Sequence, residues 1–242
     1  MKLNIIGSGS IGAKYMSASA IIDNHILIDM PNGIVKHLKS LGYKISNIDI
    51  IFITHLHGDH FADLPFFMLD NFFNKSENKV KIICPKDTYN KVNLLFELMF
   101  PGDFEKVMNA IDIDFFEYDR EEEIAVDDIK AKIYCVEHGN IKPAFGYVIE
   151  NKDKKIGFSG DSTICKEINS IVKEADISVL DMSMETEGNN AHMGYNNIKQ
   201  ICEDNPDKKI IATHMHDVTR KKAISEPIDN LIIPEINYYI SI

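Results

Sequence analysis

The alternation of apolar and polar positions predicts short strands and helices along the whole chain. Runs of aliphatic and β-branched residues predict strands at 2–6, 17–22, 25–29, 50–54, 80–84, 111–118, 129–137, 145–150, 155–159, 177–181, 209–213, 231–233 and 236–240. Apolar residues spaced three and four apart predict helices at 31–41, 62–73, 163–173 and 196–202, and another between Asp87, as N-cap, and Pro101. Since no linker-like stretch interrupts this pattern, it favours an α/β chain that forms a single domain over residues 1–242.

Three local features carry further expectations. His37 falls on the polar face of the 31–41 helix, so we expect it to be exposed to solvent. The acidic run 119–123 is interpreted as a solvated turn between two strands. The segment 61–73 contains five phenylalanines, which either pack in the core or form an apolar wall or mobile lid over the polar motif that precedes them.

Composition narrows the classes of function. No apolar run reaches 18 residues and no basic region followed by an apolar one opens the chain, so we expect a cytoplasmic protein that does not associate with membranes. The four cysteines form no Cys-x-x-Cys pair and are expected to be reduced. A net charge of −11 without an obvious basic stripe argues against a surface that grips long nucleic acid. A small anionic substrate is more compatible with this net charge, because bound metal ions would supply the local positive charge that attracts it.

The chemistry concentrates in one stretch, Thr54-His55-Leu56-His57-Gly58-Asp59-His60, which follows the apolar run 50–53. His55 and His57 are two residues apart, so an extended backbone points both side chains the same way. Imidazole and carboxylate are ligands for zinc, and about three of them hold one ion with a position left open. Four candidate ligands here, with further histidines downstream, therefore suggest two divalent ions: zinc first, with manganese or iron as alternatives.

The His-x-His-x-Asp-His pattern resembles the signature of the metallo-β-lactamase superfamily. The later ligands of that superfamily have counterparts in the expected order: His138 in 135–139, Asp161 in 158–162 and His214 in 211–214. The resemblance runs from the turn at 7–10 to the C-terminal strand and implies a four-layer αββα sandwich. It also implies the ligand sets: His55, His57 and His138 for one ion, Asp59, His60 and His214 for the other, with Asp161 bridging the two and a hydroxide between them.

Four features resemble the ribonuclease Z branch and its phosphodiesterase relatives: Asp59 in the first motif, the segment 81–86, Phe145-Gly146-Tyr147, and Asn190-Ala191-His192-Met193-Gly194. By that resemblance Asp59 and His192 are the candidate catalytic residues, and His192 protonates the leaving group. A structural or helix-capping role for His192 is the alternative. Three features depart from the processing ribonucleases. No Gly- and Pro-rich arm is present, 63–68 lacks their glycines, and Met193-Gly194 stands where they have Ser-Thr.

These observations favour a dinuclear metal-dependent phosphodiesterase. Its expected substrate is a small phosphodiester: a cyclic nucleotide, a cyclic sugar phosphate or a short RNA. A hydrolase of carboxylic esters, lactones or thioesters is the second hypothesis, because the same nucleophile attacks carbonyl carbon. A non-catalytic metal-binding or interaction protein is the third. The family resemblance also suggests a homodimer.

Overall fold

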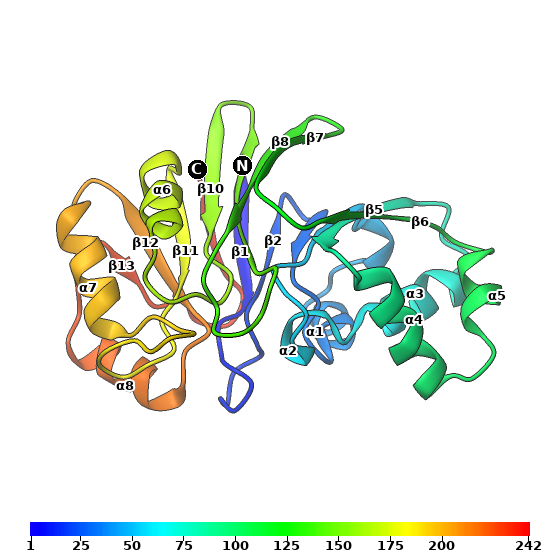
Figure 1. Cartoon of the computed structure of the whole chain (residues 1–242), viewed down its shortest axis with the longest axis horizontal. Coiled ribbons are helices and arrows are strands. Elements are labelled where there is room, and N and C mark those ends of the chain that lie inside the picture. The colour runs from blue at the N-terminus through cyan, green and yellow to red at the C-terminus, as the bar shows by residue number, and fades with distance from the viewer.

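Two seven-stranded sheets face each other in the computed structural model, which describes all 242 residues (Figure 1). The first sheet contains, in spatial order, β14 (Tyr238–Ser241), β1 (Lys2–Gly7), β2 (Ser19–Ile22), β3 (Ile26–Ile28), β4 (Ile50–Phe52), β5 (Lys79–Pro85) and β6 (Asp112–Tyr118). The second contains β13 (Leu231–Ile232), β12 (Lys209–Thr213), β11 (Ile177–Asp181), β10 (Lys154–Phe158), β9 (Phe145–Asn151), β8 (Ile129–Cys135) and β7 (Glu122–Val126).

Helices cover the outer face of each sheet. The first sheet carries α1 (Ile34–Ser40), the 3-10 turn η1 (Ile45–Asn47), α2 (Gly58–Phe61), α3 (Leu64–Phe73), α4 (Thr88–Met99) and α5 (Phe104–Met108). The second carries α6 (Lys166–Glu174), α7 (Tyr195–Asp204) and α8 (Asp217–Ser225). The predicted four-layer αββα sandwich is confirmed. The prediction of a single domain stays a prediction. None of the helices is both long and apolar enough to cross a bilayer.

The apolar run 50–53 shows why the layers form. Ile50 and Phe52 face the core between the two sheets, while Ile51 and Ile53 face the helices outside. All four side chains are at most 1% exposed. A strand buried on both faces needs apolar residues at every position, and this is why the sequence shows a continuous run rather than an alternation.

Several predicted boundaries are wrong. The acidic run 119–123 is not only a turn, because Glu122 and Glu123 begin β7, which pairs antiparallel with β8. Their charges concealed the alternation that continues to Val126. Helices α5 and α8 were not predicted. The predicted 62–73 helix is α3, which starts at Leu64, and the short helix α2 (Gly58–Phe61) before it was not predicted.

Asp87 does not cap α4 with its side chain. It lies in the left-handed region at φ 73° and makes no capping hydrogen bond. The Glu117 carboxylate on β6 accepts instead from the backbone N–H groups of Asp87 and Tyr89, at 3.0 and 2.7 Å. The N-terminus of α4 is therefore capped by a neighbouring strand, which sequence spacing alone does not reveal.

The solvent exposure of individual side chains tests two other expectations, those for His37 and for the Phe-rich segment 61–73. His37 is half-buried rather than solvent-exposed, and its Nε2 atom is shielded and makes no hydrogen bond. In the Phe-rich segment, Phe61 and Phe67 belong to the core under the first sheet, whereas Phe66 and Phe73 are 42% and 73% exposed. Most of this segment thus packs as a helical layer on the sheet.

The topology brings several strand ends to one edge of the sandwich. Strands β10, β11 and β12 are parallel, and β8 runs in the same direction because β9 is antiparallel to both β8 and β10. The end of β4 reaches the same edge, where the Phe145 N–H donates to the Thr54 carbonyl at 2.9 Å. This is the lower edge in Figure 1, opposite the two chain termini.

Candidate metal centre

The predicted ligands all follow strands that end at this shared edge. His55 and His57 follow β4, and His138, Asp161 and His214 follow β8, β10 and β12. Asp59 and His60 lie in α2, directly after the first two. The structure therefore brings together all seven side chains, in groups of the composition expected for ligands: His55, His57, His138 and Asp161 in one, and Asp59, His60 and His214 in another.

In the first group, three imidazole nitrogens converge. His57 Nδ1 lies 3.0 Å from His55 Nε2 and 3.2 Å from His138 Nε2. A tetrahedral zinc ion with bonds of about 2.0–2.1 Å holds neighbouring ligand nitrogens about 3.3 Å apart. The observed spacing is close to that value, so these three rings are already arranged as one ion requires.

Asp161 joins the two groups through a single oxygen. Its Oδ2 atom lies 3.7 Å from His55 Nε2 and 3.9 Å from His138 Nε2. The same oxygen lies 3.3 Å from both His60 Nε2 and His214 Nε2 in the second group. The second group closes with Asp59, whose Oδ2 lies 3.4 Å from His214 Nε2.

The outer nitrogen of each of three rings is held by the protein. His138 Nδ1 donates to the Ala191 carbonyl at 2.8 Å, and His60 Nδ1 lies 2.8 Å from the Asp29 carboxylate. His214 Nδ1 lies 2.8 Å from Ser183 Oγ. The carbonyl at His138 and the carboxylate at His60 can only accept, so a neutral ring at either position carries its proton outward and the lone pair of Nε2 faces the centre.

Charge interactions in this cluster are strong because it is buried. Burial raises the pKa of Asp161, but the neighbouring His214 and His60 lower it by more, leaving it well below the usual value. Burial lowers the pKa of His60, but Asp161 and Asp29 raise it to well above normal. Burial, with the charge of His60, lowers the pKa of His55 far below its usual value. Without metal, the protein thus divides protons unevenly among chemically identical rings.

The donor set fits divalent cations. Nitrogen and carboxylate donors converge from five histidines and two aspartates, and imidazole with carboxylate suits zinc, iron and manganese. The Nε2 atom of His60 is buried, faces Asp161 and has no hydrogen-bond partner. An orphaned nitrogen in so polar a cluster is costly for the protein alone but serves as a ligand for a cation.

His192 stands beside the second group and is oriented by a carboxylate. Its Nδ1 atom lies 2.9 Å from Asp181 Oδ2 and 3.3 Å from Ser183 Oγ. Its ring stacks on that of His214, with centroids 5.2 Å apart and planes 9° from parallel. Burial lowers the pKa of His192, but the hydrogen bond and charge of Asp181 raise it to above normal. The side chain is 19% exposed, so a substrate can reach it.

Backbone conformation aims two of the ligands. Gly160 has φ +58°, and a Cβ there would lie 2.6 Å from the Phe145 carbonyl and 3.0 Å from Thr54 Cβ. Only glycine allows the sharp turn before Asp161. His214 has φ +53° although it is not a glycine. Such strain is tolerated where the surrounding structure holds a functional side chain in place.

Three supporting residues were missed by the sequence analysis: Asp29, Asp181 and Ser183, which lies against His214. Asp29 holds His60 and also accepts from the Thr54 N–H and hydroxyl at 2.7 and 2.9 Å. Asp181 accepts from the N–H and hydroxyl of Ser183 at 2.9 and 2.6 Å as well as contacting His192. Asp29 comes directly after β3 and Asp181 ends β11, both of which are apolar strands. An aspartate at the end of an apolar strand was the feature of the sequence that could have revealed these two residues.

Comparisons with known proteins agree with this geometry. A family model described as "Anti-Pycsar protein Apyc1" matches residues 1–233. The Anti-Pycsar protein Apyc1 of Bacillus phage 010DV004 is 27% identical over 147 residues, which cover 59% of this chain and 54% of the phage protein. The chain thus spans about half the length of that relative. Ribonuclease Z of Thermococcus gammatolerans is 23% identical over 229 residues, covering 74% of this chain and 69% of the ribonuclease.

The fold has a close match among solved structures. The short form of human tRNase Z superimposes with a TM-score of 0.80 at 18% identity, covering 100% of this chain and 99% of the human protein. The predicted metallo-β-lactamase fold and ribonuclease Z-like branch are confirmed. With nearly its whole length matched, the chain belongs to the family described as Anti-Pycsar protein Apyc1.

Proposed function

We propose that the protein is a dinuclear metal-dependent phosphodiesterase that cleaves a small phosphodiester. The observation that carries the proposal is the convergence of four histidine Nε2 atoms on Asp161 Oδ2, at 3.3 to 3.9 Å. His57 and Asp59 complete the two groups. Such an arrangement has no use in a purely structural core, since buried polar clusters lower stability unless they are fully paired.

The two groups are proposed as the two ligand sets. His55, His57 and His138 would hold one ion, Asp59, His60 and His214 the other, and Asp161 both. Zinc is the expected metal, with manganese and iron as alternatives. When bound, a pair of divalent ions lowers the pKa of a shared water and neutralises charge that develops on the phosphoryl oxygens.

His192 is proposed to donate a proton to the departing oxygen. Asp181 holds Nδ1 of the ring at 2.9 Å, which leaves Nε2 as the nitrogen that meets the substrate. The raised pKa of His192 keeps the ring protonated to higher pH than an isolated imidazole. An alkoxide is a poor leaving group, so a positioned acid matters most for sugar phosphodiesters.

Asp59 is the second proposed catalytic residue. Its side chain is 8% exposed, and it borders the open cavity beside the centre. A carboxylate at that position can orient the attacking water and accept its proton. Burial raises the pKa of Asp59, but the hydrogen bond from His214 and the charge of His60 lower it overall, so it stays ionised at neutral pH.

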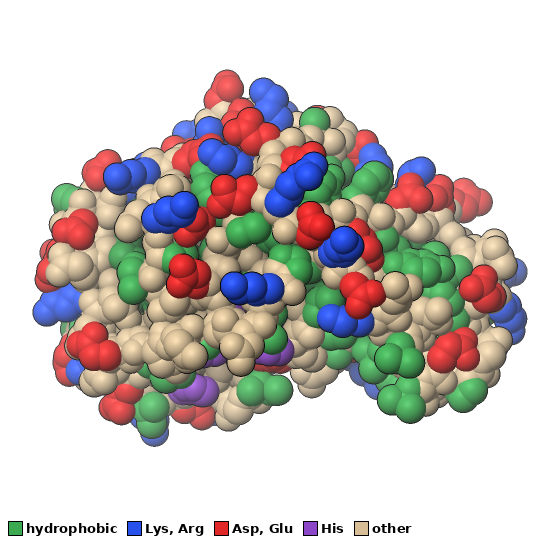
Figure 2. Space-filling model, viewed as in Figure 1, with side chains coloured by type: hydrophobic (Ala, Val, Ile, Leu, Met, Phe, Trp, Pro, Cys, Tyr) green, Lys and Arg blue, Asp and Glu red, His purple; other side chains and the backbone are tan.

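A small substrate is favoured over a long nucleic acid. The net charge is −11, and on the face shown in Figure 2 lysines and arginines alternate with acidic residues instead of forming a stripe. Binding a polynucleotide depends on several cationic contacts with phosphates. A single phosphodiester needs only the positive charge that the metal centre would supply.

The proposal is tested with a substrate panel on zinc-loaded protein. We expect hydrolysis of one or more cyclic nucleotides, cyclic sugar phosphates or short RNAs, little cleavage of a transfer-RNA precursor, and loss of activity in His138→Ala. A matched control is His25→Ala, which removes a histidine that pairs with Asp49 outside the cluster. Cleavage of p-nitrophenyl acetate or a lactone, with no phosphodiester cleaved, would contradict the proposal and favour the carbonyl hydrolase.

A further inference from the structure

The connection between β11 and α7, residues 182–194, is a closed loop at the edge of the sandwich where the metal centre lies (Figure 1). At its base the Met184 N–H donates to the Met193 carbonyl at 3.1 Å, and the Tyr195 N–H donates to the Met184 carbonyl at 3.0 Å. These bonds join the two ends of the loop, so the shape of the loop depends on the contacts made within it.

This loop contacts both ligand groups. The Ala191 carbonyl accepts from His138 Nδ1, in the first group, at 2.8 Å. The next residue, His192, stacks on His214 of the second group, with ring centroids 5.2 Å apart. The backbone conformation at these two loop residues therefore affects one ligand in each group.

The side chain of Asn189 fixes that backbone conformation. Its Oδ1 atom accepts from the N–H groups of Ala191 and His192, at 2.8 Å each. The Asn189 N–H in turn donates to the His192 carbonyl at 2.9 Å, so both backbone polar groups of His192 are paired with one residue. The Asn189 side chain is exposed to solvent, so it contributes these hydrogen bonds to the turn rather than packing to the core.

The contact with Asp181 does not by itself place the proposed proton donor. Asp181 holds the His192 ring at Nδ1, at 2.9 Å, but the position of Nε2 also depends on where the backbone carries the ring. A displacement of about 1 Å at a reacting group can lower a rate about 100-fold. Asp181 on the ring and Asn189 on the backbone together define where the proton is delivered.

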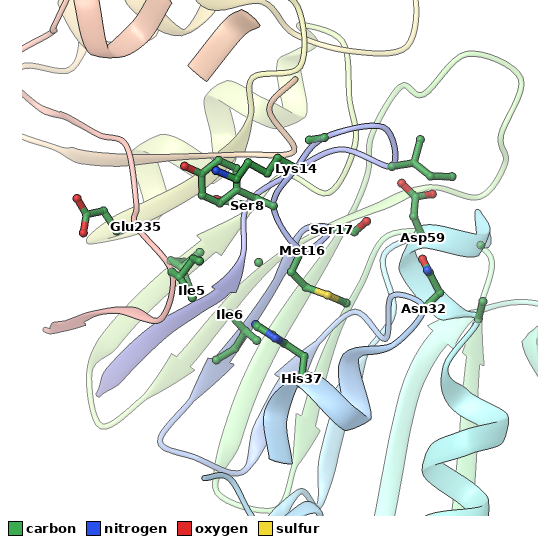
Figure 3. A pocket seen from close by; sticks show the side chains of 17 residues that line it. Ile5, Ile6, Ser8, Lys14, Met16, Ser17, Asn32, His37, Asp59 and Glu235 are labelled. Carbon is green, nitrogen blue, oxygen red and sulfur yellow. The ribbon is translucent and has the colours of Figure 1, made fainter. Parts of the chain in front are cut away.

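Asn189 lies outside the open cavity that borders the metal centre at Asp59. That cavity, of about 830 Å³, is shown in Figure 3. Its walls come from within residues 5–17, 32–37, 58–62 and 235–236, and none comes from the loop 182–194. Replacing Asn189 therefore leaves these walls unchanged, and a change in rate would come from the position of His192.

We propose that Asn189 is a positioning residue: its amide oxygen fixes the backbone of Ala191 and His192, and thereby orients His192 for proton donation and His138 for metal binding. This inference rests on the proposed function for the role of His192.

The kinetic test compares two leaving groups at a zinc concentration that saturates each variant. Asn189→Ala removes both side-chain hydrogen bonds, and we expect it to lower kcat on a cyclic nucleotide about 10-fold or more. It should lower kcat on bis(p-nitrophenyl) phosphate less than about 3-fold, because p-nitrophenolate leaves without needing a proton. KM for both substrates should stay within about 2-fold of the wild-type value, since the cavity walls are unchanged.

Two further variants separate the hydrogen bonds from a general effect of substitution. Asn189→Asp keeps an acceptor oxygen at the same position and should restore kcat on the cyclic nucleotide to within about 3-fold of wild type. The matched control is Asn190→Ala, at the neighbouring exposed asparagine. There the backbone carbonyl accepts from the Gly139 N–H, and alanine keeps that carbonyl, so the control should behave as wild type.

Zinc affinity provides a measurement that does not depend on catalysis. Competition with a chelating dye should show about 3–10-fold weaker binding in Asn189→Ala, less than the loss expected for a residue that contacts the ligand itself, because Asn189 acts on His138 only through Ala191. Asn189→Asp and Asn190→Ala should keep the wild-type affinity.

The inference for His192 would be overturned by wild-type kinetics in Asn189→Ala, by an equal loss on both substrates, or by an equal loss in Asn189→Ala and Asn189→Asp. Unchanged zinc affinity in Asn189→Ala would overturn the inference for His138. Failure of the proposed function has a different signature. In that case the wild type cleaves neither phosphodiester, and the zinc affinities still test the role of Asn189.

Discussion

Replacing His192 should slow cleavage according to the leaving group. A positioned general acid contributes about 10²–10⁴-fold to a rate, or about 2.7–5.4 kcal/mol at 1.36 kcal/mol per tenfold. That contribution is needed only when the departing oxygen is a strong base. His192→Ala should therefore lower kcat about 100-fold or more on a cyclic nucleotide and less than about 5-fold on bis(p-nitrophenyl) phosphate.

The structure also gives the expected loss of activity when Asp181, the partner of His192, is replaced. Asp181 holds His192 Nδ1 at 2.9 Å, and a hydrogen bond to a charged group contributes about 1.5–3 kcal/mol. Asp181→Asn should therefore lower kcat on the same cyclic nucleotide about 10- to 150-fold, a loss no greater than that caused by His192→Ala. If Asp181 acts only through His192, adding Asp181→Asn to His192→Ala should have little further effect.

The assay is steady-state hydrolysis of both substrates by each variant, with metal content measured in parallel. Unchanged metal content shows that the stacked ligand His214 has kept its place. An equal loss on both substrates would refute the role of His192 as a proton donor. It would instead indicate that the ring supports the metal centre.

Three further predictions concern the metal centre. Asp29→Asn removes the carboxylate that holds His60 and should weaken zinc affinity about 10–100-fold, measured by competition with a chelating dye; unchanged affinity would count against this role. Gly160→Ala should lower the melting temperature and the metal content, because its Cβ would meet the Phe145 carbonyl, and a stable variant with full metal content would show that the turn can relax. The raised pKa values of His60 and His214 contribute stability to the metal-free protein that is complete below the ordinary histidine pKa of about 6.5 and is lost as the pH rises through the folded values. Melting temperatures of the metal-free protein should therefore fall from pH 6.5 to 9 while zinc-loaded protein shows no such fall, and parallel pH profiles would contradict this.

The residues of the candidate metal centre could be identified in the sequence because their signals are local. Four of them lie within three residues of the end of a strand that is rich in apolar residues. His55, His138, Asp161 and His214 all obey this rule. Since parallel strands end at a common edge, residues with this position meet in space whatever the lengths of the connections.

The supporting network could not be predicted as well, because its contacts depend on packing between distant segments. Asp29 meets His60, and Glu117 caps a helix from a neighbouring strand. His37 was misplaced for a related reason. Its helical face is polar in sequence, but in the fold it lines a cavity together with loop 8–18 and the segment 235–236, which come from opposite ends of the chain.

The central claim is tested most directly by measuring metal content together with bis(p-nitrophenyl) phosphate hydrolysis, in the wild type and in Asp161→Ala, with a p-nitrophenyl ester as comparator. The account predicts about two divalent ions per chain, since the structure presents two ligand groups joined by Asp161. It also predicts phosphodiester cleavage that Asp161→Ala abolishes. Less than one ion per chain after reconstitution with zinc, manganese or iron would contradict the dinuclear centre, and cleavage of the ester alone would contradict the phosphodiesterase.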